Sequence, residues 1–145
     1  MRKKLLRMVE NAKATNVIEE GKEVYGKMKG GWHSYFGNDH PISLELGCGR
    51  GNYTVALAQR YPQQNFIGLD IKGARLWAGS KDAQRLALKN VAFLRTDIAF
   101  ITHFFDKEEV REVYITFPDP YPRQREAKRR LTSPRFLSLY KSILK

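Results

Sequence analysis

The sequence predicts an α/β fold of the Rossmann-like type, with a doubly wound, mostly parallel sheet. Two observations predict it: short apolar runs typical of strands buried in a parallel sheet, and segments of helical apolar spacing between these runs. Strands that alternate with helices imply right-handed crossovers, which place helices on both faces of the sheet. The chain has 145 residues, enough for one domain with a single core but not for two.

The predicted elements begin after Pro41. The first strand, 42–46, is an apolar run that Gly47 stops, and the helix after it, 52–61, ends before Pro62. The later elements alternate in the same way, with strands over 66–70, 91–95 and 112–117, a helix over 74–88 and a short segment over 98–105.

The last predicted helix begins at Ser133-Pro134 and carries an apolar stripe that runs to Leu144. Such a face must be buried against a sheet, and a helix in this position normally leads into a further strand. We therefore expect the chain to hold an incomplete, C-terminally truncated fold that is missing the last strands of the sheet.

The net charge of +11 is concentrated at the two ends of the chain. Residues 1–30 carry a net charge of +4, residues 31–120 are neutral, and residues 121–145 carry +7. Basic ends around a balanced body indicate a ligand-binding domain with extensions that contact a polyanion such as nucleic acid. We predict a basic, loosely ordered N-terminal arm over 1–30, with a short helix near Lys4–Asn11, and an incomplete domain over 31–145.

Other patterns exclude whole classes of protein. The two-residue apolar run before Arg7 is far shorter than the roughly 7–15 apolar residues of a signal peptide, and no stretch reaches the ~20 of a membrane span. The single cysteine, Cys48, excludes an internal disulfide framework, and the histidines lack the spacing of metal ligands. We expect a cytoplasmic protein without a membrane partner or bound metal, and the sequence leaves monomer and homodimer open.

A glycine-rich loop, Glu45-Leu-Gly47-Cys-Gly49-Arg-Gly51, separates the first strand from its helix. Glycine lets the backbone turn sharply and approach a ligand, and the helix N-terminus offers free amides. The spacing differs from the G-x-G-x-x-G of dinucleotide sites, which disfavours an NAD-dependent oxidoreductase. Glu45 would repel a pyrophosphate but suits a cationic, amino-acid-bearing nucleoside such as S-adenosylmethionine. We predict that Glu45 and the three glycines bind this cofactor.

Two more acids follow strands in the same way. Asp70 ends the second predicted strand about twenty residues after the glycine loop, where an acid commonly binds ribose hydroxyls, and Asp97 follows the third strand, beside the expected adenine position. Each acid alone would suit a helix cap or a surface loop. Three acids at the carboxyl ends of consecutive strands favour a binding site, because open α/β sheets bind ligands at that edge.

The strand over 112–117 leads into a Pro-rich turn, Phe117-Pro-Asp119-Pro-Tyr121-Pro122. The prolines restrict the backbone and would aim the acid and the aromatic ring at one ligand, although a plain connecting loop, with Tyr121 in the core, is an alternative. A basic cluster follows, and arginine suits phosphate because its guanidinium is a planar fork of donors. The candidate RNA-binding residues are Tyr121, Arg123, Arg125, Lys128, Arg129 and Arg130.

The stretch from Trp32 to Gly51, the turn from Phe117 to Arg123 and the run Lys128-Arg-Arg-Leu131 together resemble the bacterial tRNA (guanine-N7-)-methyltransferase family. The resemblance runs from about Tyr25 to the end of the chain, with the same order and spacing of motifs. It implies a class I, S-adenosylmethionine-dependent enzyme that methylates N7 of a variable-loop guanosine (position 46) in tRNA.

The resemblance also implies roles for single residues. Glu45, Asp70, Asp97 and Asp119 would bind S-adenosylmethionine, with Asp119 also the active-site residue, and Arg123 would contact tRNA. Three features depart from the family pattern. Tyr121 stands where Trp is usual, Arg123 stands where Lys is common, and the later strands with a Thr-Asp pair and a Thr/Glu pair are not present. We therefore expect less than full activity from these residues alone.

Two other functions remain open from the residues. The chain could be an RNA-binding protein without catalysis that keeps a methyltransferase-like sheet, or a methyltransferase that acts on another RNA. An RNA-binding protein without catalysis gives no reason for acids at three consecutive strand ends. Binding of S-adenosylmethionine therefore discriminates between such a protein and a methyltransferase.

Overall fold

The computed structural model describes residues 2–116 and 121–145. The strands are β1 (Val17–Ile18), β2 (Ile42–Leu46), β3 (Asn65–Asp70), β4 (Val91–Arg95) and β5 (Glu112–Tyr114). The α-helices are α1 (Arg2–Lys13), α2 (Trp32–Phe36), α3 (Asn52–Arg60), α4 (Gly73–Arg85) and α5 (Pro134–Ile143), and the 3₁₀ helices are η1 (Glu23–Lys27), η2 (Ile98–His103) and η3 (Gln124–Arg129). These elements confirm the predicted α/β fold and every predicted strand and helix from 42 onward.

All the strands belong to one parallel sheet with the order β1-β4-β3-β2-β5. Leu44 of β2 lies beside Ile67 of β3 on one side and Val113 of β5 on the other. The chain moves from β2 through β3 to β4, and then crosses back to place β5 on the opposite side of β2. The strand order therefore reverses next to β2, and in open parallel sheets the crevice at such a reversal is where ligands bind.

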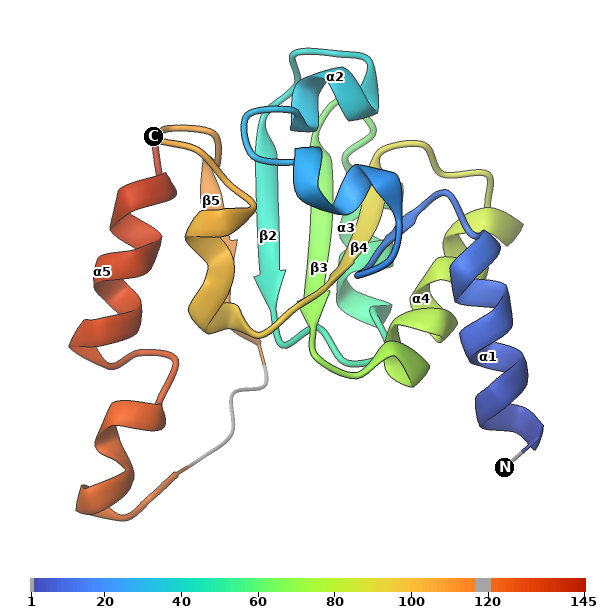
Figure 1. The fold of residues 1–145 in the computed structure, drawn as a ribbon. Coiled ribbons are helices and arrows are strands. Elements are labelled where there is room, and N and C mark those ends of the chain that lie inside the picture. The colour runs from blue at the N-terminus through green and yellow to red at the C-terminus, as the bar shows by residue number, and fades with distance from the viewer. Residues whose placement is uncertain (1, 117–120) are drawn as a thin grey trace.

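Alternate residues of the strands face two separate layers. Phe66 of β3 and Phe93 of β4 pack with α3 and α4 on one face of the sheet, whereas Ile67 and Leu94 belong to the larger core on the other face. Figure 1 shows α3 and α4 on one side of the sheet, with α1 beside α4, and α5 at the opposite end of the molecule. Burial on both faces explains why the strands are continuous apolar runs in the sequence.

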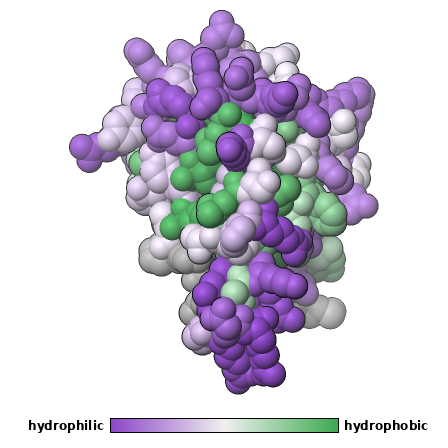
Figure 2. Space-filling model, turned by 90° about the vertical axis from the view of Figure 1, so that its left-hand side faces the viewer, coloured by the Kyte–Doolittle hydropathy of each residue, from purple (hydrophilic) through white to green (hydrophobic). Residues whose placement is uncertain are grey.

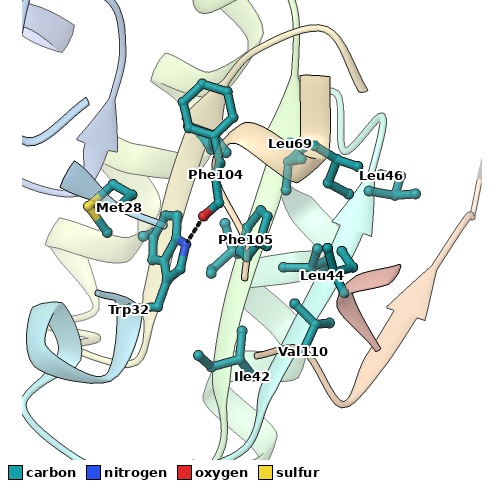
Figure 3. Packing of buried hydrophobic residues seen from close by; sticks show 14 of the residues in the cluster. Met28, Trp32, Ile42, Leu44, Leu46, Leu69, Phe104, Phe105 and Val110 are labelled. Atoms are coloured by element: carbon teal, nitrogen blue, oxygen red, sulfur yellow. Dashed lines mark hydrogen bonds between the residues drawn. The ribbon is translucent and has the colours of Figure 1, made fainter. Parts of the chain in front are cut away.

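Trp32 of α2 is the largest side chain that is fully buried in the core. Its ring stacks on Phe105 with centroids 5.2 Å apart, and its indole Nε1 donates a 2.8 Å hydrogen bond to the backbone carbonyl of Phe104 (Figure 3). A buried indole N–H needs a partner of this kind. This contact joins α2 to the segment that follows η2.

The N-terminal thirty residues correct one expectation, because they are not a loosely ordered arm. The predicted short helix is present as the longer α1, and Val17 and Ile18 of β1 are buried and pair with β4 at the edge of the sheet. The ammonium group of Lys22 donates to the carbonyls of Asn11, Ala14 and Val17 at 2.6–2.7 Å. A two-residue strand has no periodicity for a sequence to display, so this order could not be predicted.

Strand β5 is shorter than its prediction, ending at Tyr114 rather than at residue 117. On the side of β5 that does not pair with β2, the described residues form a single parallel bridge. It joins Leu144 to Val110, two residues before β5. A groove of about 770 Å³ lies between β5 and α5, with Ile115, Leu137 and Tyr140 among its lining residues. Figure 2 shows hydrophobic residues gathered on this side of the molecule.

No helix within residues 2–116 and 121–145 is both long and apolar enough to cross a membrane. Within the same two ranges, His, Cys, Asp and Glu side chains form no group of three that could hold a metal ion.

Replacing Trp32 tests the contact that joins α2 to the core. We expect Trp32→Phe to lower the free energy of unfolding by about 1–3 kcal/mol, because the Phe104 carbonyl loses a buried donor and the smaller ring leaves a gap. Urea unfolding followed by circular dichroism measures this. Leu5→Ala, at a side chain that is 56% exposed, is the control and is expected to change the value by less than about 0.5 kcal/mol. Equal values for the two variants would show that Trp32 does not join these elements.

Candidate active site

The glycine loop forms the turn between β2 and α3. Gly47, Gly49 and Gly51 have φ values of +66°, +58° and +76°, in the left-handed region that side chains other than glycine rarely adopt. Five residues therefore connect the buried strand β2 to α3. The turn explains why glycines recur at every second position of this loop.

The three glycines have different surroundings. A Cβ atom on Gly47 or Gly49 would meet no atom within 4 Å, whereas a Cβ on Gly51 would lie 2.7 Å from Cε1 of Phe93. Gly51 thus lets α3 pack closely on β4. Gly47 has open space beside it instead, and a ligand can approach the backbone only where such space is present.

Glu45 lies beneath the loop on β2 and is buried, with 3% of its surface exposed. Its two carboxylate oxygens accept hydrogen bonds from the hydroxyl groups of Thr54 on α3 and Thr116 after β5. A buried carboxylate needs such partners, because desolvation penalises it otherwise. Glu45 therefore links β2, α3 and the segment that leaves β5. Its predicted role as a cofactor ligand stays a prediction.

Asp70 lies at the carboxyl end of β3 and holds the glycine loop in place. Its Oδ2 accepts a hydrogen bond from the amide of Gly49, and its Oδ1 accepts one from the amide of Lys72, both at 2.9 Å. The structure thus brings two sequence-predicted residues, Asp70 and the central glycine, into direct contact. Each carboxylate oxygen has a second lone pair, so Asp70 still has acceptor capacity for a ligand.

Asp97 follows β4 and is exposed, and its Oδ1 accepts a 2.9 Å hydrogen bond from the amide of Ala99, which caps η2. Asp97 is therefore a helix cap, and it also lines the cleft described below. Its predicted role as a cofactor ligand stays a prediction. Cys48, between the glycines, is buried, and burial together with the carboxylates of Asp70 and Glu45 raises the pKa of its thiol well above the usual value. A thiol in that state is a poor nucleophile.

A cleft of about 480 Å³ opens at the carboxyl ends of β3 and β4. It brings together residues from the glycine loop, from both acid-bearing loops and from the basic segment after residue 120. Its lining consists of Gly47, Asp70, Ile71, Lys72, Arg75, Thr96, Asp97, Ile98, Ala99, Tyr121, Arg129, Leu131, Arg135 and Phe136. Glu45, Gly49 and Gly51 are not part of this lining.

The predicted RNA-binding residues lie on and around η3. Arg123, Arg125, Lys128 and Arg129 are exposed, and Nε of Arg123 lies 4.0 Å from the Glu126 carboxylate. Figure 2 shows hydrophilic residues gathered at the lower end of its view, where Figure 1 places this segment. Among the predicted group, only Tyr121 and Arg129 line the cleft. Asp119, the predicted catalytic residue, lies outside the described residues.

Sequence reasoning missed several residues of the site. Thr54 and Thr116 bond to Glu45 from positions 9 and 71 residues away in the chain, and no local pattern marks either of them. Arg75 and Arg135 line the cleft from the first turns of α4 and α5. The strand-end rule that found the acids could have found Arg75, because the helix after β3 begins at that same edge.

Replacing the glycines tests their separate roles. Gly49→Ala and Gly51→Ala impose similar backbone strain, but only Gly51→Ala adds a clash with Phe93. We therefore expect Gly51→Ala to lower the free energy of unfolding by about 1–3 kcal/mol more than Gly49→Ala does. Thermal or urea unfolding of the two variants measures the difference. Equal losses would mean that Gly51 has no packing role.

Comparison with known proteins identifies the family. A sequence model of the family described as "Putative methyltransferase" matches residues 39–145. The tRNA (guanine-N(7)-)-methyltransferase of Cytophaga hutchinsonii is 49% identical over 143 residues, covering 99% of this chain and 65% of that protein. The protein of the same name from Porphyromonas gingivalis is 57% identical over 118 residues, covering 81% of this chain and 48% of that protein. The chain thus spans about two thirds of the length of one of these relatives and about half of the other.

Solved structures show the same fold at low sequence identity. A 30S ribosomal A1408 methyltransferase from an uncultured bacterium superposes with a TM-score of 0.64 at 18% identity, covering 89% of this chain and 60% of that one. A SAM-dependent methyltransferase from Aquifex aeolicus gives a TM-score of 0.56 at 19% identity, covering 86% of this chain and 63% of that one. The family match over most of the chain and this shared fold lead to one conclusion: the chain belongs to the "Putative methyltransferase" family.

Proposed function

We propose that the chain binds S-adenosylmethionine in the cleft and forms the cofactor-binding part of an enzyme that methylates N7 of a variable-loop guanosine in tRNA. The observation that carries the proposal is that one cleft is lined by residues of the glycine loop, by the strand-end acids Asp70 and Asp97, and by the basic segment after residue 120. The names of the relatives from C. hutchinsonii and P. gingivalis support the reaction and the substrate.

The residues of the cleft fit this cofactor. Gly47 leaves open space for a ligand, and the carboxylates of Asp70 and Asp97 supply acceptors for hydroxyl and amino groups. We propose that Asp70 accepts hydrogen bonds from the ribose hydroxyls and that Asp97 lies beside the adenine. The volume of about 480 Å³ is in the range of pockets that hold small molecules and cofactors.

The basic segment is the proposed tRNA contact. Its exposed Arg123, Arg125, Lys128 and Arg129 form a positive surface beside the cleft, and phosphate neutralisation by such residues supplies most of the affinity for nucleic acid. Tyr121 lines the cleft on the side of this surface. We propose that its ring stacks on the target base, which must leave its own stack before it can react.

The reaction needs little acid–base chemistry from the protein. Guanine N7 carries a free lone pair, so no residue has to remove a proton. When bound, S-adenosylmethionine supplies an activated methyl group. The remaining task of the chain is to hold the base in line with that group, which accounts for a large part of the rate in such reactions. We propose that Asp119 orients the base and offsets the positive charge that develops on the purine.

Calorimetry with S-adenosylmethionine tests the cofactor site. We expect the chain to bind the cofactor, and Asp70→Asn to weaken binding about tenfold or more, because a hydrogen bond to a charged group is lost. Asp82→Asn, on an exposed face of α4 where Asp82 lies 3.6 Å from Arg85, is the matched control and keeps the wild-type affinity. No heat of binding with folded wild-type chain would contradict the proposal and favour RNA binding without catalysis.

Transfer of a labelled methyl group to tRNA tests the reaction. We expect label in a transcript with guanosine in the variable loop and none in a transcript with 7-deazaguanosine there, because that base has no N7. Asp119→Ala is expected to slow transfer about a hundredfold, as loss of a group that stabilises developing charge does. Equal labelling of both transcripts would place the target elsewhere, and an unchanged rate for Asp119→Ala would remove this residue from the active site.

A further inference from the structure

Arg130 differs from the other basic residues of its cluster. It is partly buried, and its guanidinium points to the backbone of the same chain. Nε donates a 2.9 Å hydrogen bond to the carbonyl of Tyr121, and Nη2 donates to the carbonyls of Pro122 and Arg123 at 3.3 and 3.4 Å. One planar fork of donors thus holds three consecutive carbonyl groups.

The backbone that Arg130 holds is the one that brings Tyr121 to the cleft. Tyr121 has a φ of +37°, in a region that bulky residues rarely adopt, and it is one of the residues that line the cleft. Such a conformation persists only where surrounding contacts determine it. The three hydrogen bonds from Arg130 are contacts of that kind, and they act on this residue and the two after it.

Arg130 is itself fixed to the folded body. The amide of Ser133 donates a 2.9 Å hydrogen bond to the carbonyl of Arg130, and the hydroxyl of Tyr140 donates a 2.9 Å bond to the carbonyl of the adjacent Leu131. Tyr140 and Phe136 of α5 are buried in the larger core. A continuous set of contacts therefore leads from the core through Arg130 to Tyr121.

We propose that Arg130 is a positioning residue of the active site, which fixes the backbone of residues 121–123 so that Tyr121 lines the cleft, and that it is not one of the phosphate contacts. This inference rests on the proposed function, because it assigns a task to a residue of the same site. It assigns Arg130 a role different from the sequence prediction, which grouped this residue with the RNA-binding residues of the basic cluster.

The experiment compares Arg130→Ala and Arg130→Lys with Arg125→Ala, which removes an exposed arginine from the same segment. Three quantities are measured on the full chain: the rate of tryptic cleavage after Arg123, the affinity for S-adenosylmethionine, and the salt dependence of tRNA binding. Far-UV circular dichroism establishes that each variant is folded. Arg130→Lys keeps the charge but loses the planar fork, so it separates charge from geometry.

We expect both Arg130 variants to be cleaved after Arg123 about tenfold faster than wild type and to bind the cofactor about tenfold more weakly, because the segment loses charge-assisted hydrogen bonds. Their salt slopes for tRNA binding stay at the wild-type value. Arg125→Ala is expected to show the opposite pattern: wild-type cleavage after Arg123, and a slope reduced by about one, the contribution of one phosphate contact.

The inference is overturned if Arg130→Ala lowers the salt slope by about one and leaves cleavage after Arg123 unchanged, or if Arg130→Lys restores the wild-type cleavage rate. Failure of the proposed function has a different result. In that case the wild-type chain itself binds neither the cofactor nor tRNA, and the cleavage rates still report whether Arg130 holds residues 121–123.

Discussion

The site depends on the two hydrogen bonds that the buried carboxylate of Glu45 accepts. Through Thr54 and Thr116 this carboxylate joins β2 to the helix after the glycine loop and to the segment that leaves β5. Asp70 adds a second link, because its carboxylate bonds to the loop amide of Gly49 from the neighbouring strand. The Asp70 bond holds the loop directly, and the Glu45 bonds hold the strand and the helix on either side of it. Glu45 and Asp70 therefore have a structural role in the site, because their hydrogen bonds hold the loop and its neighbouring segments together.

The elements that could be predicted from the sequence are those with a local signal. The strands β2, β3 and β4 are apolar runs because they are buried on both faces, and a glycine or an acid marks their ends. The buried strand β1 has only two residues, so nothing local distinguishes it from a loop. Asp70 and Asp97 could be found because strand ends meet at one edge of the sheet. Thr54 and Thr116 could not be predicted, because no local sequence pattern marks a hydroxyl group that donates a hydrogen bond to a carboxylate far away in the chain.

Charge alone predicted a single basic cluster at the C-terminal end, and the structure divides that cluster by geometry. Arg125 and Lys128 are exposed on η3, whereas Arg130 turns its guanidinium to the backbone of the segment that carries Tyr121. Arg129 and Arg135 line the cleft next to the acids. The positive charge of this end thus has three positions with different chemistry: the open surface, the cleft wall and the interior of the turn. Only the fold distinguishes them, because the sequence has basic residues in each of the three positions.

Amide spectra of the labelled chain titrated with S-adenosylmethionine test most directly whether a nucleoside cofactor occupies the cleft at the ends of β3 and β4. Binding in the cleft predicts the largest shifts at Gly47, Ile71 and Ile98, which line it, and little change at Leu137 and Lys141, which line the groove between β5 and α5. Shifts confined to that groove, or a spectrum that does not change at all, would contradict the account.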